Sequence, residues 1–364
     1  MTSRSPREPA LASVGAGTAP APERARRISP SWVTRLIAWV ERLPGPSWPV
    51  YLIAAVVEGL ITSAFAWATG TAPVGEFSGP LVYYGALPVA ILWTMHNLDG
   101  TARRALIAFR PALTLDEGGY ARLLDELTVV PARGVWITTV AVFPLNLLWY
   151  ASDPVGTATA NLSIPALAIR ALNEGLVTIL FIVLIYHTIR QLRAVSRIHE
   201  QATLVELFRP APLYAFSRLT SRTAILLLVL TFSSLVVDPA SWTSISPIWM
   251  IGWAGGALAV ALTAFVLPLA GIHGRIVAEK LHLEAEVGSR LTGVMASVHA
   301  IADADDLARA DGLNKLLASL IAERELVGRL PTWPWQPGTM GAVLSAIVLP
   351  IGLFLATRML ERVV

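Results

Sequence analysis

The chain has 364 residues, of which 54% are hydrophobic and 15% charged, and its formal net charge is +3. A soluble globular chain is usually about 25% charged, so most of this chain cannot form a solvated surface. Because the sequence contains no cysteine, disulfides, thiolate metal sites, iron–sulfur clusters and thiol catalysis are excluded. The small positive charge favours contact with anionic lipid headgroups, and no nucleic acid partner is expected.

Segments rich in Lys and Arg alternate along the chain with loops that contain neither residue. The loops without Lys or Arg are 71–79, 151–163 and 238–246. The basic segments that alternate with them are 96–133, 190–222 and 273–330. Positively charged loops of membrane proteins stay in the cytoplasm while the helices between them cross the bilayer. The pattern therefore predicts a multi-pass plasma membrane protein with its N-terminus in the cytoplasm.

The first two segments lie before the membrane part of the chain. Residues 1–30 are rich in Ser, Pro, Ala and Arg without apolar periodicity, which predicts a disordered cytoplasmic tail. Segment 31–47 is predicted to hold a short amphipathic helix on the inner membrane interface. Its apolar residues at helical spacing are Trp32, Leu36, Ile37, Val40 and Leu43. Pro44 and Pro46 then end this helix before the chain enters the membrane.

The middle of the chain, 48–272, reads as a bundle of membrane-crossing helices with helical cytoplasmic loops. A bilayer core of about 30 Å needs about 20 apolar residues in a helix. Six stretches fit this length: 48–70, 79–96, 134–151, 167–189, 223–238 and 248–272. A seventh, over 339–357, would leave Arg358 and Arg362 on the outer side, so a helix that enters and stops, or lies in the interface, is the alternative. The expected fold is all-α, a polytopic transmembrane helical bundle.

Segment 273–330 is predicted to form a cytoplasmic antiparallel helical hairpin. Apolar residues recur at three- and four-residue steps over 275–301 and again over 313–326, with an acidic turn between them. Each apolar stripe has to be buried against its partner helix, the inner face of the bundle or another subunit. Segment 331–364 then combines a Trp- and Pro-rich interfacial turn, 331–337, with the last membrane helix.

Glu58 is the most informative single residue because it lies in the middle of the first predicted crossing. An ionised carboxylate at that depth is costly, so it must face the bundle, a partner or water. One interpretation is a proton- or cation-binding group. The other is a polar contact, with the carboxyl protonated, to Thr62, Ser63 or another helix.

Arg170 and Glu174 are four residues apart and therefore share one face of the fourth predicted crossing. The simpler interpretation is a local ion pair that neutralises both charges. The alternative is a polar vestibule that also includes Asn146 and Asn173.

His96, His187 and His273 each end an even-numbered crossing on the inner side. Neutral imidazoles can bind a metal or haem where they converge, but histidines are also ordinary residues of membrane interfaces. We expect no metal site and no cofactor. Segment 99–103, Asp-Gly-Thr-Ala-Arg, resembles the start of the CDP-alcohol phosphotransferase signature, but its spacing differs and the later Gly and Asp residues are missing.

Three blocks, 109–113, 213–220 and 330–337, resemble a family of uncharacterised bacterial polytopic membrane proteins. The resemblance implies the architecture and a bacterial plasma membrane, and it carries no activity. Because no catalytic constellation is evident, the chain is expected to be no enzyme. We expect a sensor, scaffold or assembly partner that acts through 273–330, by binding a protein partner or by self-association. The alternative is a transporter or channel for an ion or small solute that uses Glu58, with Arg170 and Glu174.

Overall fold

The computed structural model describes residues 28–152, 162–201, 207–208, 214–238, 247–304, 307–335 and 338–360. Over these ranges the regular elements are helices, and the one β-type contact is an isolated bridge between Pro30 and Pro131. The all-α prediction is therefore confirmed for the described part of the chain. The predicted tail, 1–30, lies almost wholly outside the described residues.

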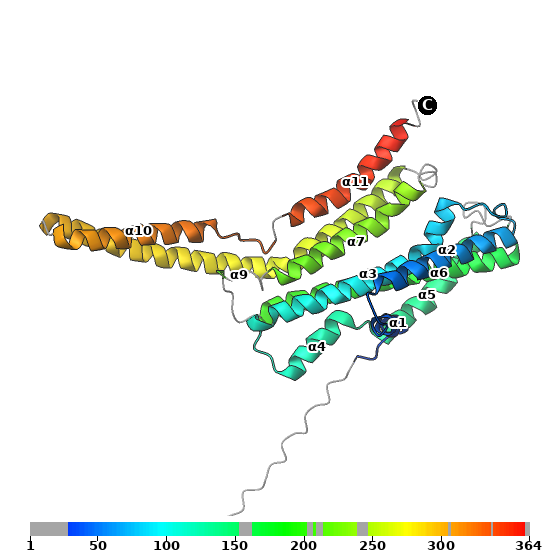
Figure 1. The fold of residues 1–364 in the computed structure, drawn as a ribbon, viewed down its shortest axis with the longest axis horizontal. Coiled ribbons are helices and arrows are strands. Elements are labelled where there is room, and N and C mark those ends of the chain that lie inside the picture. The colour runs from blue at the N-terminus through cyan, green and yellow to red at the C-terminus, as the bar shows by residue number, and fades with distance from the viewer. Residues whose placement is uncertain are drawn as a thin grey trace, which may run out of the picture.

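The helices follow one another with short connections (Figure 1). In chain order they are α1 (Trp32–Glu41), α2 (Trp48–Ala68), α3 (Gly79–Phe109), the 3₁₀ turn η1 (Arg110–Ala112), α4 (Glu117–Thr128), α5 (Ala132–Ser152), α6 (Ile164–Gln201), α7 (Ala215–Val237), α9 (Pro247–Ala304), α10 (Leu307–Arg329) and α11 (Thr339–Leu360).

Within the described ranges, four helices are long and apolar enough to cross a membrane, which supports a membrane-embedded protein. The stretches are Trp48–Ala68 in α2, Ile164–Glu200 in α6, Ala215–Val237 in α7 and Ala254–Ala300 in α9. Helices α5 and α11 contain shorter apolar stretches, and α3 is not among the four. The first part of α3 is less apolar because it contains Pro80, Tyr83 and Tyr84. The remaining crossings, 79–96, 134–151 and 339–357, stay predictions.

Helix α9 joins two elements that the sequence suggested were separate. The crossing predicted over 248–272 and the helix predicted over 275–301 form one uninterrupted helix of 58 residues. Helix α10 returns along its second half, since the Lys280 ammonium donates to the carbonyl oxygens of Gly328 at 2.7 Å and Leu330 at 3.0 Å. In Figure 1 this pair extends away from the other helices.

The main hydrophobic core surrounds α3 and α6. Its fully buried members on these two helices include Ile91, Met95, Leu98, Leu180 and Leu184. Residues of α1, α4, α5, α7 and α9 complete the same core. A second core joins α7, α9 and α11, with Phe232, Phe265 and Val343 among its buried residues. Helix α3 is thus the element against which most of the polar side chains discussed below are positioned.

Helices α2 and α3 approach each other closely at two glycines. A Cβ atom on Gly85 would lie 2.5 Å from the Thr62 hydroxyl oxygen, and one on Gly59 would lie 2.9 Å from Val82 Cγ1. Small residues at such positions let helix backbones come together in a membrane. This contact fixes the position of α2, and with it the position of Glu58.

Helix α1 lies where the sequence places it, but its buried face is rotated relative to the expected one. Ser31 caps the helix by accepting a hydrogen bond from the Thr34 backbone N–H. Val33, Ile37 and Val40 are buried, whereas Trp32 and Leu36 of the expected apolar face are more than a third exposed. The protein core therefore covers one side of α1 and leaves an apolar rim on the other.

Candidate functional site

A network of polar side chains surrounds residues 96–104 of α3, and we call it the α3 polar network. It connects α3 with α1, α2, α6 and α7, and through Gln191 it reaches the last turn of α4. Its members are Glu41, Tyr51, His96, Asp99, Thr101, Arg103, Arg104, His187, Gln191 and Arg222.

Asp99 and His187 form the buried centre of the network. His187 Nε2 lies 2.7 Å from Asp99 Oδ1, and the two side chains are 0% and 5% exposed. The Gln191 amide lies 3.5 Å from the same carboxylate oxygen and donates to the Leu127 carbonyl oxygen at 2.8 Å. Burial raises the pKa of the Asp99 carboxyl above its ordinary value, and the contact with His187 opposes that rise.

The tautomer of His187 follows from its surroundings. Its Nδ1 atom is buried and has no hydrogen-bond partner within the described ranges. A neutral ring that donates from Nε2 leaves only a lone pair unmatched there, whereas a charged ring would leave an N–H group unmatched. His187 therefore donates its Nε2–H to the Asp99 carboxylate.

Two further groups tie α3 to its other neighbours. On one side, the Tyr51 hydroxyl lies 3.0 Å from His96 Nδ1, and Glu41 lies 3.8 Å from His96 Nε2 and 3.4 Å from the Arg103 guanidinium. On the other side, the Thr101 hydroxyl accepts hydrogen bonds from Arg104 at 3.2 Å and from Arg222 of α7 at 3.0 Å.

The centre of the network is inaccessible, and this limits what it can do chemically. An acid–base group has to come within hydrogen-bond reach of a substrate. Asp99 and His187 are almost fully covered by protein, so the pair acts as a polar clamp between α3 and α6. The Asp99 carboxylate of segment 99–103 is directed at the His187 imidazole.

The structure does not bring the three predicted histidines together. His96 lies against Tyr51, and His187 lies against Asp99. His273 Nδ1 lies 2.8 Å from the Thr332 carbonyl oxygen, and its ring stacks on Trp333 with centroids 3.9 Å apart. In the part of the chain that the structure describes, no group of three or more His, Asp or Glu side chains could hold a metal ion.

The three candidate pathway residues lie in two separate places. Arg170 and Glu174 form an ion pair on α6, with 2.7 Å between Nε and Oε1, as the simpler interpretation expected. Asn173 between them donates to the Tyr84 carbonyl oxygen at 3.3 Å. Glu58 on α2 is partly exposed, and its carboxylate makes no hydrogen bond or ion pair with any described residue. No hydrogen bond or ion pair links it to Arg170 or Glu174 among the described residues.

An aromatic junction that the sequence did not reveal lies where α3, α6 and α7 meet. The rings of Phe109, His199 and Phe216 have centroids 5.3 to 5.6 Å apart in edge-on pairs. His199 Nδ1 also donates to the Pro268 carbonyl oxygen of α9 at 3.1 Å. Phe109 and Phe216 belong to two of the blocks that suggested a family resemblance, and that is the one signal that marked them.

The turn 331–337 is held against α9 by stacked rings. Trp333 stacks on His273, Trp335 stacks on Trp333 with centroids 4.5 Å apart, and Trp335 stacks on Phe265 at 5.3 Å. Residues 336 and 337 lie outside the described part. This stack holds the segment after α10 against α9, close to the point where the α9–α10 pair leaves the bundle.

No protein family model, curated protein or solved structure matches this chain. The likeness of 109–113, 213–220 and 330–337 to uncharacterised bacterial membrane proteins therefore stays a prediction.

Proposed function

We propose that the protein is a non-enzymatic assembly partner in a bacterial plasma membrane and that it acts through the α9–α10 pair on the cytoplasmic side. The observation that carries the proposal is the single helix α9, which leads without a break from an apolar span into a pair that leaves the bundle. Because the apolar span and the first helix of the pair are both parts of α9, a movement of the span also moves the α9–α10 pair.

The surface of the pair supports a role in association. Two helices can bury only one stripe each against one another, and Val287, Leu320 and Val327 occupy those stripes. Large apolar side chains remain exposed outside them: Leu281, Met295, Leu316, Ile321 and Leu326. From residue 273 onward, α9 extends about 48 Å by helical rise. A second α9–α10 pair would cover the side of α10 that holds Leu316 and Leu326 by forming a four-helix bundle, so self-association is the form of assembly we propose.

The proposed topology has the N-terminus and the α9–α10 pair inside, with six crossings and a seventh at α11. It is supported by the loops without positive charge and by the four apolar helices. Because the chain contains no cysteine, single-cysteine variants have no background labelling. We expect a membrane-impermeant maleimide to label Val74→Cys in intact cells and Asn314→Cys, exposed on α10, only after lysis. Labelling of both positions from the same side would reverse the orientation.

Self-association predicts that Leu316→Glu shifts the purified protein from dimer to monomer. Leu316 is 47% exposed on α10, and a carboxylate there would have to be desolvated in the bundle. The expected effect is at least about a tenfold weaker dimer, equivalent to about 1.4 kcal/mol, measured by light scattering in detergent over a dilution series.

The matched control for this variant is Asn314→Glu, which adds the same charge to another side of the same helix. It should leave the dimer intact. A parent protein that stays monomeric at every concentration would rule out self-association. A cross-link to a different protein that disappears in Leu316→Glu would mean that this protein, and not a second copy of the chain, is the partner.

A transporter or channel is the second candidate, and one observation favours it. The Glu58 carboxylate lies in the middle of an apolar helix without a partner among the described residues, which is a typical position for a proton- or cation-binding group. Among the described residues no hydrogen bond or ion pair joins Glu58 to the Arg170–Glu174 pair, which argues against one continuous polar pathway. The test compares the flux of ions or small solutes into proteoliposomes between the parent protein and Glu58→Gln. A flux that is lost in the variant supports the transporter or channel, and an unchanged flux means that Glu58 is not its binding group.

A further inference from the structure

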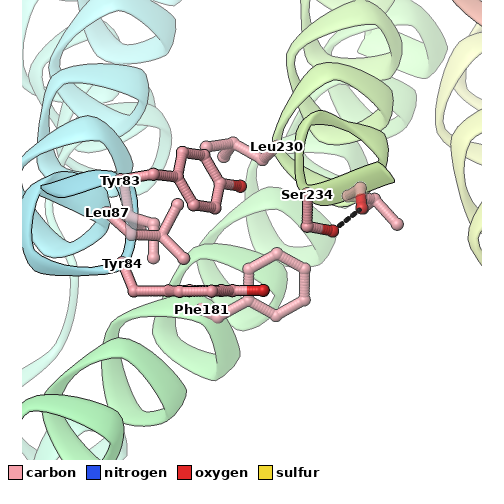
Figure 2. A pocket seen from close by; sticks show the side chains of 8 residues that line it. Tyr83, Tyr84, Leu87, Phe181, Leu230 and Ser234 are labelled. Atoms are coloured by element: carbon pink, nitrogen blue, oxygen red, sulfur yellow. Dashed lines mark hydrogen bonds between the residues drawn. The ribbon is translucent and has the colours of Figure 1, made fainter. Parts of the chain in front are cut away.

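A pocket of about 290 Å³ lies between α3, α6 and α7 (Figure 2). It is lined by Tyr83, Tyr84, Leu87 and Ile91 of α3, Phe181 of α6, and Leu230, Thr231 and Ser234 of α7. Figure 2 shows the side chains of Tyr83, Tyr84 and Leu87 reaching from α3 toward the space beside Phe181 and α7. The α3 polar network and the α9–α10 pair contribute none of these residues.

One end of the pocket is polar. The Tyr83 hydroxyl lies 2.7 Å from the Ser233 hydroxyl, and the Tyr84 hydroxyl donates to the Asp238 carboxylate at 3.4 Å. Tyr83 and Tyr84 belong to the first turns of α3, which begins at Gly79. Ser233 belongs to the last turns of α7, which ends at Val237, and Asp238 follows directly. In the proposed topology both helix ends lie at the outer interface of the membrane, where tyrosine is common.

The other end of the pocket is apolar. Leu87 and Ile91 lie up to about 12 Å further along α3 than Tyr83, and Leu230 lies about 6 Å below Ser234 on α7 by helical rise. The pocket therefore changes from hydroxyl-lined to hydrocarbon-lined along the direction in which a membrane lipid changes from headgroup to chain. Its volume accommodates about ten water-sized groups, which matches an alkyl chain of about ten carbon atoms.

The polar end also selects the head of a ligand. The Ser233 hydroxyl donates to the Leu230 carbonyl oxygen at 3.2 Å, so Tyr83 donates to Ser233 and the Tyr83 oxygen is left to accept a hydrogen bond from a bound hydroxyl. The Asp238 carboxylate at the same end disfavours an anionic head. We propose that this pocket binds one alkyl chain with a neutral, hydrogen-bond-donating hydroxyl at its head. A diacylglycerol and a free long-chain alcohol share this chemistry.

The site is tested with the full-length protein in phosphatidylcholine nanodiscs. One arm contains diacylglycerol with a diazirine group in its acyl chain, and the other receives a free diazirine-labelled dodecanol. Cross-links should concentrate on segments 83–91 and 230–234 in at least one arm, and the arm that gives them identifies the source. Labelling spread evenly over the exposed apolar helices, with no concentration on these segments, would overturn the proposal.

Competition by unlabelled dodecanol tests the head contact. Tyr83→Phe keeps the ring but removes the hydroxyl, so we expect dodecanol to compete about fivefold to tenfold less well, while dodecane competes equally against parent and variant. Tyr120→Phe on α4 is the matched control and should behave as the parent. Equal competition by dodecanol in Tyr83→Phe and Tyr120→Phe would overturn the proposed head contact. Because none of these measurements involves α9–α10, the result does not depend on the proposed assembly role.

Discussion

Replacing His187 by alanine is expected to destabilise the protein by about 3–5 kcal/mol, because the Asp99 carboxylate then stays buried without its main hydrogen-bond donor. The two groups are 2.7 Å apart and almost completely covered. Water cannot replace the imidazole unless the contact between α3 and α6 opens. A denaturant titration of the purified protein in detergent, followed by circular dichroism, measures the loss.

His282→Ala is the matched control, since His282 is exposed on α9 and its loss should change stability by less than about 0.5 kcal/mol. A double variant, Asp99→Leu with His187→Leu, removes both polar groups and should recover much of the stability lost in His187→Ala. If His187→Ala and His282→Ala unfold at the same denaturant concentration, the pair is not the clamp described above.

The helices were predictable because their signals are local. Hydropathy marks α2, α6, α7 and the first half of α9, and three- and four-residue spacing marks the second half of α9 and α10. The continuity of α9 was not predictable in the same way. Basic residues after position 272 mark the membrane boundary, but helical hydrogen bonds within the backbone do not depend on that boundary. No residue between 269 and 304 forces the helix to end.

The Asp99–His187 pair was beyond sequence reasoning for a geometric reason. The charge pattern predicts how deep each helix end lies in the membrane, and it places His96 and His187 at similar depths. The same pattern does not predict the rotation of a helix about its axis. That rotation decides whether His96 or Asp99 faces α6. That rotation is set by the packing of Leu98, Leu180 and their neighbours in the core.

Glu58 shows the complementary case, in which the sequence located a residue but could not assign its surroundings. The contacts of Gly59 and Gly85 bring α2 onto α3, and the Glu58 side chain remains partly exposed, without a hydrogen bond or ion pair to a described residue. Helical periodicity gives the face, but only the identity of the neighbouring helix decides between a protein contact, a lipid contact and a wet pathway.

Replacing Phe216 by alanine is expected to cost about 3–5 kcal/mol, because it opens a cavity where three helices meet. The Phe216 side chain is fully buried, and its ring centroid lies 5.3 Å from those of both Phe109 and His199. His199 also bonds to Pro268, so the loss should loosen α9 as well as α7. The same denaturant titration measures the effect.

Phe208→Ala is the control for this change, since it removes the same side chain from a position that is 63% exposed. Phe216→Leu should cost clearly less than Phe216→Ala because leucine fills part of the cavity. An equal loss in Phe216→Ala and Phe208→Ala would mean that the junction of Phe109, His199 and Phe216 does not hold the helices together. The ordering Ala below Leu below Phe at position 216, with no change at position 208, is the outcome that a packed aromatic junction requires.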